Sequence, residues 1–357
     1  MLMRLGLVML LALAAAVPAA AQEKMPAIPF LEAWLASSHA NVKSESFTHW
    51  DKDGKVPVSC AMCHSGPGFV DFLGGDGSPA GKVDHPAPIR SVIDCVTCHD
   101  KNARSLESVK FPSGMTASNL GPSARCMVCH QGRQSTPSVN RQVGNLSDDT
   151  VSKNLGFINV HYRAAAATLW GTEAKGAYEY PGKSYHGRFA HTPSFNTCTQ
   201  CHDAHRLTVD AKSCTTCHGR KDMKAIRQSR IDFDGDGNTG EGISGEIETL
   251  HQALGQAITA YAAQVAKSPI AYDAHHHPYY FVDKNGNGKA DADEINRANG
   301  YTSWTPRLVK AAYNYQFIAK DPGAYAHNPP YALQILYDSL ESLAARVPVK
   351  LARMKRP

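Results

Sequence analysis

The ten cysteines constrain this 357-residue chain more than any other feature, because all of them fall into one repeated pattern. Each pair has the spacing C-x-x-C, and a histidine follows the second cysteine directly every time. The five instances are Cys60, Cys63 and His64; Cys95, Cys98 and His99; Cys126, Cys129 and His130; Cys198, Cys201 and His202; and Cys214, Cys217 and His218. No cysteine is left over, so one kind of chemistry has to account for the whole set.

Three kinds of chemistry use paired cysteines. Five disulfides would suit an exported chain, but disulfide pairing does not require a histidine after every second cysteine. Zinc ribbons use their C-x-x-C knuckles in pairs, and five is an odd number. Covalent haem attachment explains every position, since two thiols bond to the haem vinyl groups and the adjacent imidazole reaches the iron. The pattern therefore predicts five haem c groups, with the five motif histidines as proximal ligands.

With these five motifs, the chain resembles the multihaem c-type cytochromes. The closest likeness is to exported or outer-membrane-associated polyhaem cytochromes of bacterial respiratory chains. This resemblance implies haem as the cofactor and electron transfer as the class of chemistry, and it says less about the physiological role.

Each closed haem iron needs a second axial ligand, and the chain has twelve histidines outside the motifs. A second imidazole gives a low-spin centre suited to electron transfer, whereas methionine would raise the reduction potential. Sequence context, and the resemblance for some of them, favours six histidines as distal ligands: His39, His49, His161, His191, His205 and His327. His251 shares an apolar helical face and is expected to be a hydrogen-bonded core residue. His85, His186 and the 275–277 cluster are expected in loops.

Two acidic loops resemble calcium sites. Residues 283–294 match the EF-hand loop at positions 1, 3, 5, 7, 9 and 12, with glycine at position 6. These positions are Asp283, Asn285, Asn287, Lys289 (through its carbonyl), Asp291 and Glu294. A second loop begins in the same way with Asp232, Asp234, Asp236 and Asn238. Its twelfth residue is Ile243, so Glu241 or Glu246 would have to close it. The alternative for both loops is a turn rich in asparagine and glycine.

The first residues have the pattern of a secretory signal peptide. A short basic start precedes an apolar run of about 13 residues, too short for the ~20 that span a membrane. We expect three parts: a leader over 1–21, a haem-binding region over 22–220, and a helical region over 221–357 that packs against it. No transmembrane segment is expected after cleavage, and the mature chain is expected in the periplasm or at the cell surface.

The expected fold is mainly α, with extensive irregular loops wrapped around the haems and little β structure. Segments such as 111–154 lack periodicity, and haem supplies the apolar surface that such loops otherwise miss. In the C-terminal part, Ser244 is expected to cap a helix running to about Lys267. Thr305 is expected to open a second helix that ends before Asp321, and Asn328 to open the last. The inward residues are expected to be Ile247, Leu250, Leu254, Ile258, Tyr261 and Val265 in the first, and Leu333, Leu336, Leu340, Leu343 and Val347 in the last.

The sequence thus predicts an electron carrier with no catalytic residue. Its partners would be redox proteins or quinol-linked membrane complexes, other multihaem cytochromes, or copies of itself. A formal charge of +5 is too small to indicate nucleic-acid binding. Two alternatives stay open: a reductase of nitrogen or sulfur oxyanions with one open haem, and a polymeric filament that shares a ligand histidine across subunits.

Overall fold

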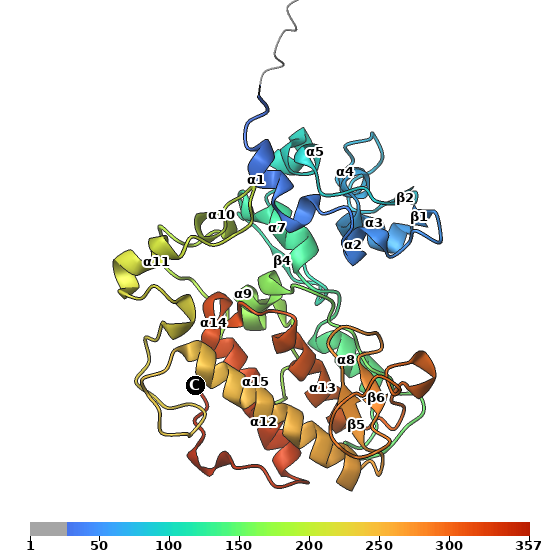
Figure 1. Ribbon diagram of the computed structural model, residues 1–357, viewed down its shortest axis with the longest axis vertical. Helices are drawn as coiled ribbons and strands as arrows, with labels where there is room; N and C mark the ends of the chain where they lie inside the picture. Colours follow the sequence, from blue (N-terminus) through green and yellow to red (C-terminus); the bar gives the residue numbers. More distant parts are fainter. Residues whose placement is uncertain (1–26) are drawn as a thin grey trace, which may run out of the picture.

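The computed structural model describes residues 27–357, so the predicted leader over 1–21 lies outside the described residues. Helices dominate this range, and its strands form only three two-stranded antiparallel sheets. The prediction of a mainly α fold with little β structure is confirmed. Figure 1 shows the short N-terminal helices at one end of an elongated molecule and the long C-terminal helices at the other.

The N-terminal half consists of short elements joined by loops. Its helices are α1 (Leu31–Leu35), η1 (Ser38–Ala40), α2 (Glu45–Thr48), α3 (Val58–His64), α4 (Gly66–Phe72), α5 (Cys95–His99), α6 (Lys101–Arg104), α7 (Ser123–His130), α8 (Thr136–Val143), α9 (Ala165–Ala174), α10 (Cys198–Cys201) and α11 (Ala211–His218). Strand β1 (Lys55–Val56) pairs with β2 (Ala87–Pro88), and β3 (Val109–Lys110) pairs with β4 (Thr116–Ala117). Helices of four to ten residues are marginal in isolation, so this half depends on tertiary contacts for its order.

The C-terminal half is built on three longer helices that pack together (Figure 1). Its elements are η2 (Met223–Ala225), α12 (Ile243–Gln264), β5 (Ile270–Tyr272), β6 (Tyr280–Val282), η3 (Arg297–Asn299), α13 (Pro306–Ala319), α14 (Ala324–His327), α15 (Pro329–Ala344) and η4 (Leu351–Arg353). Strand β5 pairs antiparallel with β6, with Ile270 opposite Val282. The apolar faces of α12, α13 and α15 form the centre of the core.

Two of the three predicted helix starts are confirmed. Thr305 caps α13 by accepting a hydrogen bond from the Leu308 amide, and Asn328 caps α15 by accepting one from the Tyr331 amide. The prediction that Ser244 caps α12 is wrong, because the cap is Gly242 and the helix begins at Ile243. A Cβ atom at 242 would lie 1.7 Å from the Lys224 carbonyl oxygen, so the close approach of these two segments requires glycine.

The predicted inward faces are confirmed, apart from Val265, which is only half-buried. The segment 111–154 is less irregular than its sequence suggests, since it contains α7 and α8. The main apolar core includes residues on both sides of position 221, such as Met127 and Leu340. Within residues 27–357, no helix has both the length and the apolar character that crossing a membrane requires.

Candidate functional site

Every C-x-x-C-H motif lies on a short helix or at its end. Helices α3, α5, α7 and α11 each end on the motif histidine, and α10 ends one residue before His202. Helical spacing places residues i and i+3 on one face, so both thiols of a motif point to the same side. All ten cysteines are free thiols in the described residues. The structure thus contains no disulfide framework between them and presents paired thiols beside an imidazole.

The ten motif cysteines differ in how far the chain covers them. Cys95, Cys201 and Cys217 are exposed, whereas the other seven are half-buried: Cys60, Cys63, Cys98, Cys126, Cys129, Cys198 and Cys214. Each exposed cysteine shares its motif with a half-buried one, so each motif has at least one thiol that the fold partly covers. The sequence pattern treats all ten positions alike and does not predict this difference. An exposed thiol remains accessible to a haem vinyl group, so the assignment of Cys95, Cys201 and Cys217 to thioether bonds stays a prediction.

The five motif histidines are each faced by one of the predicted distal histidines. The pairs, with the distances between ring centroids, are His64–His161 (5.6 Å), His99–His205 (6.1 Å), His130–His39 (6.4 Å), His202–His327 (6.4 Å) and His218–His191 (5.9 Å). Four of the five partners come from distant segments of the chain.

These separations fit one iron atom between each pair of rings. A metal–imidazole bond is about 2 Å long, so two imidazoles on opposite faces of a metal place their centroids about 6 Å apart. In the tightest pair, the Nε2 atoms of His64 and His161 lie 3.3 Å apart, somewhat less than the roughly 4 Å that two such bonds in line would span.

Hydrogen bonds orient several of these rings for metal binding. The Nδ1 of His64 lies 2.8 Å from the Ser46 carbonyl oxygen, and that of His130 lies 3.0 Å from the Arg163 carbonyl oxygen. A carbonyl oxygen only accepts, so the proton is on Nδ1 and the Nε2 lone pair is free. This is the tautomer that an iron ligand requires.

Comparison with known proteins agrees with the haem c interpretation of the motifs. The chain is 27% identical over 352 residues to the "C-type polyheme cytochrome OmcB" of Geobacter sulfurreducens, in strain DL-1 / KN400 and in strain PCA. It is 27% identical over 341 residues to the "C-type polyheme cytochrome OmcC" of strain PCA. Each alignment covers 83% of this chain. The chain is thus similar to multihaem c-type cytochromes over most of its length.

The chain spans less than half the length of these relatives, 45% of OmcB and 38% of OmcC. No family model and no solved structure matches it. The assignment therefore concerns the class of cofactor and the type of protein, and the relatives' roles as whole proteins do not transfer with it.

The C-x-x-C-H motifs also approach one another. The Cys129 thiol donates to the carbonyl oxygen of Met62, inside the first motif, at 3.8 Å. In addition, the Cys198 amide donates to the Ser123 hydroxyl of α7 (3.1 Å). The third motif therefore lies directly between the first and the fourth.

Burial keeps two of the predicted distal histidines neutral. It lowers the pKa of His39 to about 4, with a further contribution from His130, and it lowers the pKa of His161 to about 4, with a further contribution from His64. A neutral imidazole keeps the lone pair that a metal needs. Both rings are thus in the ligand form at neutral pH.

The remaining histidines have other surroundings. His49 is the one distal candidate with no motif histidine facing it in the described part of the chain. Its ring is exposed, 3.7 Å from Glu45 and edge-on to Trp50. His251 stacks on Tyr315 and lies 2.8 Å from the carbonyl oxygen of that residue, which matches the expected core role.

The predicted loop 283–294 is folded around two buried carboxylates. Asp283 accepts from the amides of Gly286 and Gly288, both at 2.7 Å, and Glu294 accepts from the Lys284 amide at 2.7 Å. The amide groups of Asn285 and Asn287 each donate to Asp291 at 2.8 Å. Asp283 and Glu294 are only 2% and 1% exposed, and no lysine or arginine of the described residues pairs with them. Buried carboxylates without a counter-charge fit a cation site.

The second loop brings carboxylates together in the same way. Asp232 accepts from the amides of Gly235 (2.7 Å) and Gly237 (2.8 Å), and the Asp236 and Asn238 amides donate to Asp234 and Asp236. Oxygens of Asp234, Asp236 and Glu241 lie within 4.8 Å of one another. One buried oxygen of Asp234 and one of Glu241 have no partner.

Glu246, the other candidate for closing this loop, already has partners within the protein. Its carboxylate accepts from the amides of Phe233 and Asp234, both at 2.8 Å, and forms an ion pair with Arg227. Oxygens of Asp232, Asp234 and Glu246 also lie within 4.8 Å of one another. Because Arg227 already neutralises Glu246, Glu241 is the better candidate for the closing ligand.

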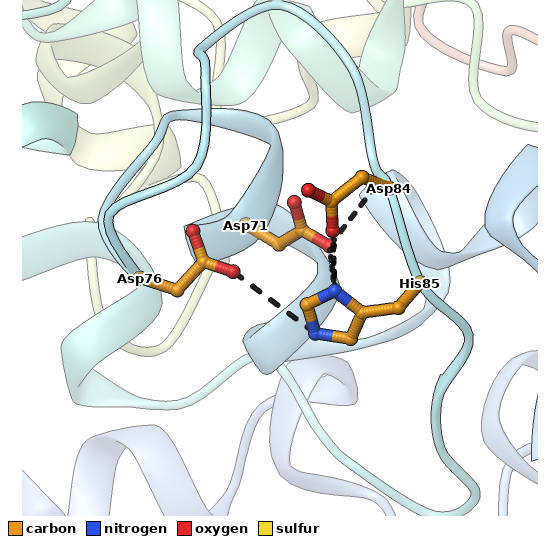
Figure 2. Close-up of side chains that lie close together, drawn as sticks. All are labelled: Asp71, Asp76, Asp84 and His85. Carbon is orange, nitrogen blue, oxygen red and sulfur yellow. Dashed lines mark hydrogen bonds and ion pairs between the residues drawn. The ribbon is translucent and has the colours of Figure 1, made fainter.

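Outside the haem motifs and the acidic loops, three carboxylates surround His85 (Figure 2). The Nδ1 of His85 faces Asp84 in a very short contact and lies 3.5 Å from Asp71 of α4, while its Nε2 lies 4.0 Å from Asp76. The two ring nitrogens face different carboxylates rather than a shared centre. When His85 is protonated, its ring is itself the cation of this cluster.

We expect His85 to titrate above its ordinary pKa of 6.5, because the Asp84 hydrogen bond and the nearby Asp71 and Asp76 charges favour the protonated ring. The contact then stabilises the loop fully below about pH 6.5 and is lost as pH rises through the raised pKa. NMR titration of the histidine ring protons measures this pKa. Asp84→Asn is expected to lower it and Asp53→Asn, an exposed control, to leave it unchanged; an Asp84→Asn midpoint equal to the wild type's would refute the assignment.

Proposed function

We propose that the chain is an exported pentahaem cytochrome that relays electrons through five bis-histidine c-type haems, in respiratory or extracellular electron transfer. The observation that carries this proposal is the pairing of every motif histidine with a second histidine at 5.6–6.4 Å. An iron with an imidazole on each face has no open position for a substrate, which suits electron transfer rather than catalysis.

The residues with assigned parts are the ten motif cysteines, from Cys60 to Cys217, which would hold five haems through thioether bonds, and the ten paired histidines, which would bind the irons. When bound, the haem supplies a one-electron iron couple. The chain supplies the orientation of the rings through the Nδ1 contacts, and burial that excludes water from rings such as His39 and His161.

The same pairing weighs against the two alternatives. An oxyanion reductase needs one iron without a distal ligand, and none of the five motif histidines lacks a facing histidine. A filament that shares ligands across subunits needs a histidine from a second copy, and within residues 27–357 all five partners come from the same chain. The expected partners are redox proteins, quinol-linked membrane complexes or other multihaem cytochromes, in the periplasm or at the cell surface.

The test is EPR of the oxidised protein with its haem content measured independently. We expect five haems per chain and low-spin signals that account for all of them. A stoichiometric high-spin signal would mean an open iron and would replace the proposed carrier by a reductase. A haem count below five would contradict the reading of the motifs.

We further propose that region 22–220 binds the haems and that region 221–357 stabilises the haem-binding region through two calcium-bound loops. Support comes from the buried, uncompensated carboxylates of Asp283, Glu294 and Asp234. Calcium prefers such oxygen ligands and would fix the connections on either side of α12.

Removing calcium should lower the thermal stability of the cytochrome. A ligand present at 100 times its Kd stabilises the native state by about 2.7 kcal/mol, so chelation should lower Tm measurably. Calorimetry with and without calcium measures the shift. Glu294→Gln is expected to remove most of the calcium response of the first loop, whereas Glu248→Gln, at an exposed site on α12, is expected to retain it. Equal Tm values with and without calcium would contradict the calcium assignment.

A further inference from the structure

A buried carboxylate lies against one of the paired histidines. Asp321 is in the short connection between α13 and α14 and is only 3% exposed. Both of its oxygens lie 2.9 Å from the Nδ1 of His327, whose ring faces His202 on its other side. No lysine or arginine of the described residues forms an ion pair with Asp321, so the imidazole is the partner of its charge.

This contact differs from those of the other paired histidines. His64, His130 and His202 have neutral backbone carbonyl oxygens next to Nδ1, at 2.8, 3.0 and 3.4 Å. Among the ten paired histidines of residues 27–357, His327 alone is hydrogen-bonded to a carboxylate. A carboxylate attracts the Nδ1 proton more strongly than a carbonyl does, because the hydrogen bond is charge-assisted.

The local structure holds this contact in place. The Gly323 amide donates to Asp321 at 3.1 Å, and the Ala324 amide donates to the Asp321 carbonyl oxygen at 3.0 Å. A Cβ atom on Gly323 would lie 2.6 Å from the His327 ring, so glycine leaves the space that the ring occupies. The turn therefore fixes both the carboxylate and the imidazole.

We propose that Asp321 is a positioning residue that makes His327 an unusually basic ligand and lowers the reduction potential of the His202–His327 haem relative to its value without the carboxylate. This inference rests on the proposed bis-histidine haems. A buried anion hydrogen-bonded to a ligand imidazole increases electron donation to the metal and favours the ferric state, which carries more positive charge. Asp321 thereby adjusts the reduction potential of one haem in the relay without contacting its iron.

The test replaces Asp321 by asparagine in the full haem-loaded protein and follows all five reduction potentials by spectroelectrochemistry. Changes in such ligand partners alter metal affinity about 10–100-fold. A tenfold change in the preference for ferric over ferrous iron corresponds to about 59 mV for a one-electron couple. We expect one potential to rise by about this amount while the other four move less, and Asp321→Glu to restore part of the difference.

Asp148→Asn is the matched control, because it removes a negative charge near Lys310, toward the other end of α13. It is expected to leave all five potentials near their wild-type values. Five low-spin haems with unchanged potentials in Asp321→Asn would overturn the inference and leave the proposed function standing. A wild-type protein without five low-spin haems would instead overturn the proposed function.

A second measurement needs no variant. In the fully reduced wild-type protein with 15N-labelled histidine, the Nδ1 proton of His327 is expected far downfield of the other ligand Nδ1 protons, because it alone is shared with a carboxylate. A set of ligand Nδ1 resonances with no such outlier would overturn the inference even if every Asp321 variant fails to mature.

Discussion

Replacing His39 by alanine will turn one iron in five high-spin. The His39 ring faces the His130 ring, and the ring centroids lie 6.4 Å apart. His39 lies in η1, within a loop-rich N-terminal segment. Without it, the iron held at His130 keeps a single imidazole and an open face. EPR of the oxidised variant, quantified per haem, should show a high-spin signal for one haem, and four should stay low-spin.

His49→Ala is the control that the structure provides. Both histidines precede the first motif and both have the sequence context of a distal ligand, but the ring of His49 is exposed beside Glu45. We expect this variant to keep five low-spin haems. The assignment of His39 fails if the two variants give the same spectrum, or if His49→Ala is the one that opens an iron.

Replacing Leu340 by alanine will lower the free energy of unfolding of the protein by about 2–5 kcal/mol, the range for large-to-small changes in a packed core. Leu340 is fully buried on the inward face of α15. The resulting cavity lies in the main apolar core. Urea denaturation followed by far-UV circular dichroism measures the loss, and EPR of the native variant should still show five low-spin haems.

Leu146→Ala is the comparison, because Leu146 is 40% exposed and its removal leaves no cavity. Its effect should stay within about 0.5 kcal/mol. A Leu340→Ala variant that is as stable as Leu146→Ala would mean that α15 contributes little to the fold. A Leu340→Ala variant with an opened iron would mean that the haem ligands depend on the α12, α13 and α15 core more closely than the geometry indicates.

The five C-x-x-C-H motifs are recognisable in the sequence because each lies within five consecutive residues, and their roles in haem attachment and proximal ligation are predictions from that local pattern. Sequence context favours all six distal candidates, and the structure places five of them beside a motif histidine. The sixth, His49, has the same kind of context as His39. Only the tertiary distance to a motif histidine distinguishes these two, and that distance depends on how the loops between them fold. The exposure of Cys217 beside the half-buried Cys214 is likewise a tertiary property that the motif does not record.

The fold was most predictable where the chain has ordinary helical periodicity and caps. The starts of α13 and α15 follow from Thr305 and Asn328, whose side chains bond to the backbone within one turn. The start of α12 does not, because the position of Gly242 is set by the Lys224 carbonyl oxygen, a contact that no local pattern records. Likewise, α7 and α8 lie in a segment with no clear periodicity, since their burial comes from packing in the shared core.

Under the proposed ligation, the histidine pairs would also determine when each iron becomes fully ligated as the chain is made. The partner of His218 is His191, which is synthesised shortly before it. The partner of His202 is His327, which follows only after α12 and α13 have been made. A metal bond between such distant residues closes a long loop, and the entropy cost of closure grows slowly with length, by about 0.6 kcal/mol per doubling. The iron of a haem joined to Cys198 and Cys201 would therefore lack its distal ligand until the C-terminal helices have formed. The contact between His327 and Asp321 would be among the last to form.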